Sequence, residues 1–155
     1  MKDKLAILIV GHQNSGKTTT IKYFDKVYDE NETLKRYCRV GWRHLQLFKG
    51  KLYAIFSLIY FIPASPTETQ KPLKKRLGKM LPELLLMAEQ KNGKEYNNTI
   101  EFLNENNYKI IEFYTKDNSN EIWKEWNNKT FEDLMNKRAT AIGNEFREFI
   151  INRIK

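Results

Sequence analysis

A glycine-bounded loop near the start of the chain constrains its fold more than any other segment. The loop reads Gly11-His12-Gln13-Asn14-Ser15-Gly16-Lys17-Thr18. It follows the aliphatic run 5–10, in which polar and apolar residues do not alternate, as is typical of a parallel strand covered on both faces. After the loop, apolar residues recur at helical spacing over residues 17–28. The order strand, loop and helix predicts an α/β fold.

The residue types in the loop suit the binding of phosphate. Gly11 and Gly16 are expected to let successive amides point inward, at a helix N-terminus whose dipole favours negative charge. Lys17 is expected to reach the β and γ phosphates, and the Thr18 hydroxyl to ligate Mg²⁺. An accidental glycine turn would not explain the flanking strand and helix. The predicted phosphate-binding residues are Gly11, His12, Gln13, Asn14, Ser15, Gly16, Lys17, Thr18 and Thr19.

Over residues 1–30 the chain resembles the P-loop NTPase superfamily. The resemblance implies a three-layer α/β/α sandwich with a mostly parallel sheet, and Mg²⁺-dependent binding of ATP or GTP. GTPases of this superfamily read guanine with an Asn-Lys-x-Asp motif. Gln90-Lys91-Asn92-Gly93 and Asn128-Lys129-Thr130-Phe131 lack its aspartate, and Thr115-Lys116-Asp117 has an aspartate one residue early. ATP is therefore the expected nucleotide, with GTP as the disfavoured alternative.

Strands and helices continue to alternate along the chain. Segments 44–48 and 52–62 are predicted to form an antiparallel pair around Gly50, which is expected to take a positive φ. The second segment belongs to the most apolar stretch, 52–64, and is predicted to be buried. A strand at 83–89, preferred over a helix, then a helix around 99–103 and a strand at 109–114 follow, which predicts a parallel sheet.

The C-terminal segment 120–155 is predicted to be helical, with Thr130 opening a capping box. Its apolar stripe is expected to pack across the sheet of the same domain, so that residues 1–155 form one domain. Trp123 and Trp126 are expected to anchor this helix to the body. Arg138 and Arg147 are weaker candidates for fingers that reach a neighbouring subunit.

An acidic partner for Mg²⁺ is harder to find. A P-loop hydrolase normally ends a second aliphatic strand with aspartate, and no hydrophobic run here does so. Glu89, which ends the run 84–88, is the first substitute, and a solvent-facing strand end is its alternative explanation. Glu68 is the second candidate, with a helix N-terminal carboxylate as the simpler explanation. Both stay open as catalytic residues.

Two basic segments are further candidates. Residues 67–80 are predicted to form a basic helix or lid, in which Arg76 would close on a transferring phosphoryl group as in the small nucleotide kinases of this superfamily. A solvated helix face is the alternative. Arg36, Arg39 and Arg43, interleaved with Tyr37 and Trp42, suit a second phosphorylated substrate or a stacked base, although core packing is the simpler explanation of the aromatic residues.

Charge and cysteine content limit the partners and the compartment. The 27 Lys and Arg residues exceed the 19 Asp and Glu residues, and a net charge of +8 favours a nucleotide, a nucleic acid or an acidic protein as partner. Cys38 is the only cysteine, and neither a secretory signal nor a membrane-spanning run is recognisable, so we expect a cytoplasmic protein.

The functional prediction is an ATP-binding protein, either a Mg²⁺-dependent NTPase or a small kinase-like phosphotransferase. The alternative is a nucleotide-regulated binding module whose basic face engages nucleic acid or a protein.

Overall fold

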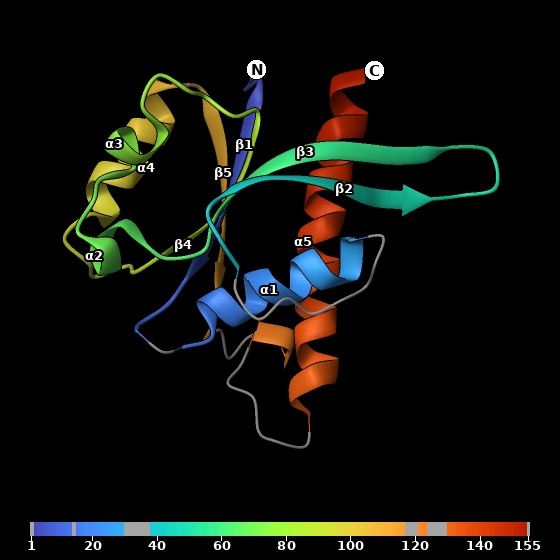
Figure 1. The fold of residues 1–155 in the computed structure, drawn as a ribbon, viewed down its shortest axis with the longest axis horizontal. Helices are drawn as coiled ribbons and strands as arrows, with labels where there is room; N and C mark the ends of the chain where they lie inside the picture. Colours follow the sequence, from blue (N-terminus) through green and yellow to red (C-terminus); the bar gives the residue numbers. More distant parts are fainter. Residues whose placement is uncertain (1, 14, 30–37, 117–120, 124–129, 155) are drawn as a thin grey trace.

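A five-stranded sheet organises the chain (Figure 1). The computed structural model describes residues 2–13, 15–29, 38–116, 121–123 and 130–154. The strands are β1 (Lys4–Val10), β2 (Gly41–Lys49), β3 (Ala54–Ile62), β4 (Leu84–Glu89) and β5 (Tyr108–Tyr114). Their order is β2-β3-β4-β1-β5, and only the β2-β3 pair is antiparallel. The sheet is thus mixed and mostly parallel, which confirms the α/β class and the antiparallel hairpin.

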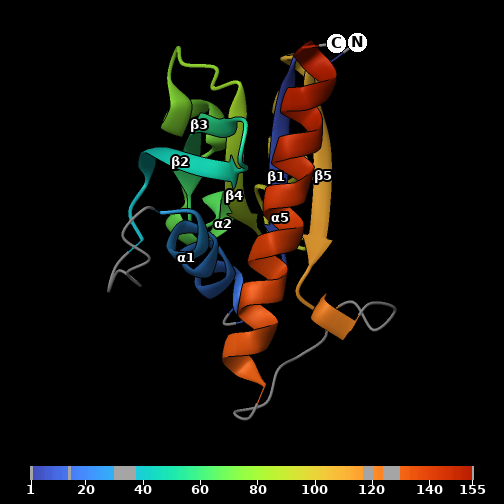
Figure 2. The same ribbon diagram turned by 90° about the vertical axis from the view of Figure 1, so that its right-hand side faces the viewer.

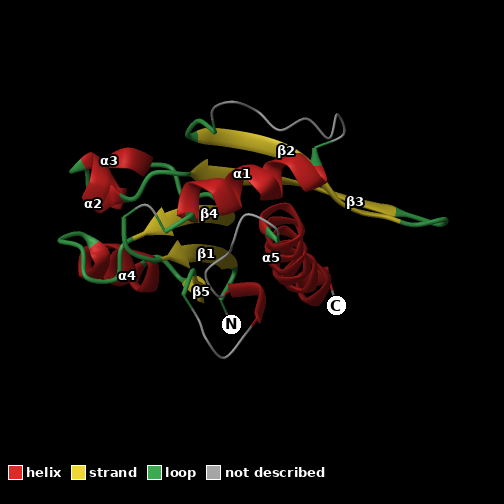
Figure 3. Cartoon of the chain, turned by 90° about the horizontal axis from the view of Figure 1, so that it is seen from below, coloured by secondary structure: helices red, strands yellow, loops and turns green. Residues whose placement is uncertain are grey.

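Helices cover both faces of the sheet, as Figure 3 shows from below. They are α1 (Lys17–Tyr28), α2 (Pro66–Thr69), α3 (Leu73–Leu77), α4 (Tyr96–Glu105) and α5 (Phe131–Ile154), with the short 3₁₀ helix η1 (Glu121–Trp123). The helices α1 and α5 lie on one face, and α2, α3 and α4 lie on the other (Figures 1 and 2). The long C-terminal helix therefore packs against the sheet and α1, as predicted.

The central position of β1 in the sheet explains why polar and apolar residues do not alternate in its sequence. Leu5, Ile7 and Ile9 belong to the apolar cluster with α1 and α5, whereas Leu8 and Val10 belong to the cluster with α3 and α4. Successive side chains of a strand point to opposite faces, so a strand covered on both faces must be apolar throughout. Both faces of β1 contribute to the core, and its carboxyl end fixes the position of the loop that follows.

The β2-β3 hairpin differs from the prediction in two ways. Toward the tip of the hairpin only the face toward α1 and α5 is buried, because the hairpin projects past the layer of α2, α3 and α4 (Figure 1). At the end of β3, Ile62 is buried on the other face. On the other face Phe56 is 47% exposed and Leu58 is 54% exposed, so the prediction of a fully buried strand is wrong. Gly50 does not have a positive φ. A Cβ there would lie 2.8 Å from the Phe48 ring, so crowding explains the glycine.

The basic segment 67–80 forms two short helices rather than one. Leu73 and Leu77 of α3 are buried in the cluster that contains α4 residues, which fixes α3 to the body of the protein. At the other end of the chain, Trp123 stacks on Phe113 with ring centroids 4.6 Å apart, and so anchors η1 to the sheet. Trp126 lies outside the described residues. No helix in the described part of the chain is long and apolar enough to cross a membrane.

Candidate functional site

The loop after β1 stays separate from the helix that follows it. The helix α1 begins at Lys17, and Gly16 is its N-cap, with φ 93° in the left-handed region that favours glycine. The first bond of the helix runs from the Thr20 amide to the Gly16 carbonyl, at 2.9 Å. The first turn contains no acidic residue, and none of the side chains that the structure describes caps it. The amide end of α1 is therefore available to an anion.

Hydrogen bonds hold the loop between the carboxyl ends of β4 and β5. The Gly11 amide donates to the Glu89 carbonyl at 3.1 Å, and the Thr115 amide donates to the Val10 carbonyl at 2.9 Å. The Thr115 hydroxyl lies 2.9 Å from the Ser15 hydroxyl and bonds to it. In parallel α/β sheets, ligands bind outside the carboxyl ends of the strands, where neighbouring connections diverge. The loop occupies such a position.

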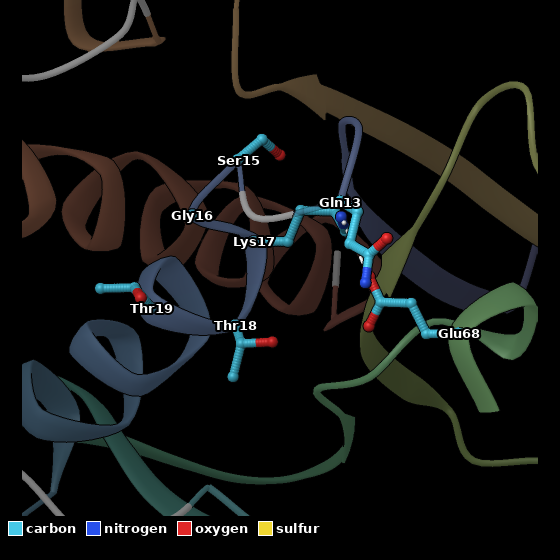
Figure 4. Close-up of a pocket in the computed structure, with 7 residues that line it drawn as sticks. All are labelled: Gln13, Ser15, Gly16, Lys17, Thr18, Thr19 and Glu68. Atoms are coloured by element: carbon cyan, nitrogen blue, oxygen red, sulfur yellow. Dashed lines mark ion pairs between the residues drawn. The ribbon is translucent and has the colours of Figure 1, made fainter.

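The Lys17 side chain lies against the loop and not in the apolar core. Its Nζ donates to the His12 carbonyl at 2.7 Å and forms an ion pair with Glu68 Oε1 at 3.3 Å (Figure 4). Only 3% of the side chain is exposed. A buried lysine needs anionic or polar partners. Here both partners are oxygens, which phosphate oxygens can replace.

A cavity of about 370 Å³ opens in front of this ammonium group. Its volume falls within the roughly 300 to 1,000 Å³ of ordinary ligand pockets. The lining residues are Gln13, Ser15, Gly16, Lys17, Thr18, Thr19 and Glu68. Gln13, Lys17 and Glu68 meet on one side of the loop, whereas the side chains of Ser15 and Thr19 point away (Figure 4).

The remaining predicted loop residues lie beside the cavity or outside the description. Gly11 and His12 do not line it, and the exposed His12 ring places Nδ1 2.9 Å from the Gln13 carbonyl. His12 contributes its carbonyl to Lys17. Asn14 lies outside the described residues.

The Thr18 hydroxyl has a partner that the sequence does not predict. It donates to the carbonyl of Pro63 at 2.8 Å, directly after β3. Because its hydrogen is committed to Pro63, the lone pairs of the hydroxyl remain for a cation. The strand end that meets Thr18 thus offers a carbonyl oxygen and no carboxylate. No side-chain pattern in the sequence could identify this role, because every residue carries a carbonyl.

Glu68 is the candidate acid that reaches the cavity. Ser65 caps α2 by accepting a bond from the Glu68 amide at 3.1 Å, which fixes the backbone of Glu68. Its Oε1 accepts a bond from Gln90 Nε2 at 3.1 Å in addition to the Lys17 ion pair. Thr18 and Glu68 together supply oxygen ligands of the kind that Mg²⁺ prefers. Among the described residues no group of three or more His, Cys, Asp or Glu side chains could hold a metal ion, so water or ligand oxygens would complete the shell of a cation at Thr18 and Glu68.

Glu89 is placed differently from Glu68. It is fully buried, so the alternative of a solvent-facing strand end is wrong. Its Oε2 accepts a bond from the Thr99 hydroxyl at 2.7 Å, and its Oε1 accepts one from the Gln90 amide at 3.0 Å. Burial raises the pKa of this carboxyl above its usual range. Glu89 does not line the cavity, and its contacts join β4 to α4.

We expect Glu89→Gln to stabilise the protein more at pH 7 than at pH 4. The raised pKa means that the folded state binds the Glu89 proton more tightly than the unfolded state does. The stabilising contribution of Glu89 is therefore complete below its unfolded pKa and is lost as pH rises through its folded pKa. Glutamine keeps an acceptor for Thr99 and carries no charge. In urea unfolding, the free-energy difference between variant and wild type should rise with pH, by at most about 1.4 kcal/mol per pH unit. A difference that stays constant from pH 4 to 7 would contradict this account.

The arginine candidates mostly have structural contacts. Arg76 donates from Nη1 to the Ala64 carbonyl at 2.7 Å and does not line the cavity, and burial lowers its pKa. Arg147 donates to the Leu47 carbonyl at 3.3 Å. Arg138 is fully buried, so its predicted role as a finger for a neighbouring subunit is wrong.

Arg138 instead supports the loop from behind. Its Nη1 lies 3.3 Å from the Thr20 hydroxyl, and its Nη2 lies 3.4 Å from the Thr115 carbonyl. Its guanidinium lies over the Trp123 ring, 5.1 Å from the ring centroid. Burial lowers the pKa of Arg138 to about 10. The sequence contained a signal for this position, since Arg138 falls four residues after Leu134 and four before Ile142 on the apolar stripe of α5.

Comparison with models of known protein families, with curated proteins and with solved structures finds no match. The site itself brings an uncapped helix N-terminus, a buried ammonium group, a hydroxyl and a carboxylate together around one cavity.

Proposed function

We propose that this chain is a Mg²⁺-dependent ATPase with a P-loop NTPase-like three-layer sandwich. The observation that carries the proposal is the buried Lys17 ammonium, which faces a cavity of about 370 Å³ at the amide end of α1. A cation and a helix N-terminus that converge on one cavity suit a polyanion of the size of a triphosphate. ATP is preferred over GTP because the chain has no Asn-Lys-x-Asp motif.

Each residue of the site has a defined task in this proposal. Triphosphate oxygens displace the Glu68 carboxylate from Lys17, and the amides of the loop bind the same phosphates. Thr18 would offer its lone pairs to Mg²⁺, while its hydroxyl hydrogen remains donated to the Pro63 carbonyl. Bound Mg²⁺ supplies charge neutralisation at the phosphates. Glu68, released from Lys17 and still bonded to Gln90, is placed to orient the attacking water.

Hydrolysis is favoured over phosphoryl transfer by the placement of the basic segment. A kinase lid must move over its substrates. Leu73 and Leu77 hold α3 in the core, and Arg76 is bonded to Ala64. Incubation with ATP labelled in the γ phosphate should therefore release labelled inorganic phosphate. Label that appears on another molecule of the assay would contradict hydrolysis and support the phosphotransferase alternative.

Glu68→Gln is expected to separate binding from hydrolysis. Without Mg²⁺ the variant should bind ATP at least as tightly as wild type, because the carboxylate no longer competes for Lys17 or repels the phosphates. With Mg²⁺ its turnover should fall by about 100-fold, the lower end of what a positioned acid or base contributes. Calorimetry in EDTA and phosphate release in Mg²⁺ measure the two effects.

Glu89→Gln is the matched control, because it makes the same chemical change outside the cavity. Its turnover should stay close to wild type. Loss of turnover in Glu89→Gln with normal turnover in Glu68→Gln would assign the catalytic carboxylate to Glu89. A thermal-shift series with ATP, ADP and GTP, each with and without Mg²⁺, tests binding itself, since a ligand raises the melting temperature according to its affinity.

A further inference from the structure

The β2-β3 hairpin exposes a row of rings that the ATP site does not use. Most of the large apolar side chains exposed in the described part of the chain lie in or next to this hairpin: Val40, Trp42, Leu52, Tyr53, Phe56 and Leu58. On the face turned away from α1 and α5, five large side chains alternate along the two strands. We call this surface the hairpin open face, and it consists of Trp42, His44, Phe56, Leu58 and Tyr60.

Four of the five side chains on the hairpin open face are rings, and they pack in pairs. Trp42 lies opposite Tyr60, with ring centroids 5.2 Å apart in an edge-to-face arrangement. His44 stacks on Phe56 at 5.7 Å, with an angle of 9° between the rings. Trp42 is 45% exposed and Phe56 is 47% exposed. Core packing, the simpler explanation offered above for Trp42, is therefore wrong.

A hollow of about 430 Å³ borders this face, where β3 extends past the start of β4. Trp42, His44, Phe56 and Leu58 line it together with Ser57, Glu83 and Leu84. Glu83 is the acid of this lining, and it forms an ion pair with Arg153 Nη1 at 3.0 Å. The hollow thus has aromatic walls, and the charge of its Glu83 carboxylate is balanced by Arg153.

The charge of the segment points to an anionic occupant. Residues 38–67 contain four cations, Arg39, Arg43, Lys49 and Lys51, and no Asp or Glu. Arg43 lies 3.5 Å from Asp25 on the opposite face of the hairpin. The other three are exposed, with Arg39 just before β2 and both lysines at the turn. Cations at both ends of a ring surface match a chain that carries phosphates on one side and bases on the other.

We propose that the hairpin open face binds single-stranded nucleic acid. Bases stack on Trp42 and Phe56, and phosphates pair with Arg39, Lys49 and Lys51. An exposed sheet face with rings is a known platform for unstacked bases, which a duplex cannot offer. The net charge of +8 strengthens the attraction at long range. At a site of this kind, stacking contributes more to affinity than base-specific hydrogen bonds do, so little sequence preference is expected.

The test is fluorescence anisotropy with a labelled oligothymidine of about 15 nucleotides, the upper range of such sites. Micromolar binding is expected near 50 mM NaCl, with a log–log salt slope of roughly −2 for three phosphate contacts. Phe56→Ala should weaken binding by about 5-fold to 100-fold and leave the slope unchanged, because a lost stacking partner carries no charge. Leu58→Ala is the matched control: Leu58 is 54% exposed on the same face and has no ring. Its affinity should remain within about 2-fold of wild type.

Two further variants test the charges and the fold. Lys49→Gln with Lys51→Gln should reduce the slope by about 1.4. Phe56→Tyr should bind oligothymidine with wild-type affinity, because it keeps a ring at this position. All variants should keep the wild-type melting temperature and ATP response. Undetectable oligothymidine binding would overturn the proposal, as would equal binding of wild type and Phe56→Ala. Self-association that both Phe56→Ala and Leu58→Ala abolish, without oligothymidine binding, would identify the face as a contact between copies and would also overturn it.

Discussion

Lys17→Ala is expected to lower ATP affinity by about 30-fold to 1,000-fold, the cost of removing one member of a buried charged pair. The Lys17 ammonium is the buried cation that faces the cavity, and its side chain contacts the loop and Glu68 rather than the apolar clusters. The fold should therefore persist. Removal of the lysine leaves Glu68 without this ion pair, but the carboxylate is 26% exposed and keeps its bond to Gln90. Calorimetric titration with ATP and Mg²⁺, beside circular dichroism, measures both effects.

Lys26→Ala makes the same change of charge about two and a half turns further along α1 and serves as control. Lys26 pairs with Glu132 at 3.3 Å on the exposed side of the helix. Its loss should change ATP affinity by less than about 2-fold, since exposed ion pairs contribute little and long-range attraction is screened by salt. Wild-type ATP affinity in Lys17→Ala would refute the proposed site. Equal losses in both variants would show that net charge, and not the loop, attracts the nucleotide.

The parts of the fold that local chemistry determines were predictable from sequence. The six aliphatic residues of β1 require cover on both faces, and the glycine, lysine and threonine of the loop fix where the helix begins. The strand at β4 was also predicted correctly, although its length alone would have allowed a helix. In each case a short run of consecutive residues carries the pattern that predicts the element.

Features that depend on distant contacts were not predictable in this way. Phe56 and Leu58 belong to an apolar run that suggests burial, and only the extent of the α2-α4 layer decides that one face stays open. Glu89 ends a strand and was therefore the first candidate, but its side chain turns to Thr99 of α4, whereas Glu68 of α2 reaches Lys17. Pro63 acts through a carbonyl, which carries no signal in the sequence.

Gly11→Ala is expected to abolish detectable ATP binding and to lower the melting temperature by about 2 to 12 °C, the cost of overpacking a well-filled site. Gly11 does not have a positive φ, so its backbone could accept alanine. The space around Gly11 cannot hold an alanine side chain, because a Cβ would lie 2.1 Å from Thr115 Oγ1 and 2.3 Å from Ser15 Oγ. These two oxygens hold the loop to the end of β5. The loop must therefore move, and its amides move with it.

Removal of the two colliding oxygens tests this explanation. Ser15→Ala with Thr115→Ala should weaken ATP binding when Gly11 is intact, because the bond between the hydroxyls is lost. The same two changes should restore part of the ATP affinity and melting temperature when added to Gly11→Ala, since the nearest remaining atom, Ser15 Cβ, lies 3.3 Å away. A double-mutant cycle of this kind should give a favourable coupling of about 1 to 3 kcal/mol. If the triple variant is no better than Gly11→Ala, crowding is not the reason for glycine, and the loop must require it for backbone geometry that forms only with bound phosphate.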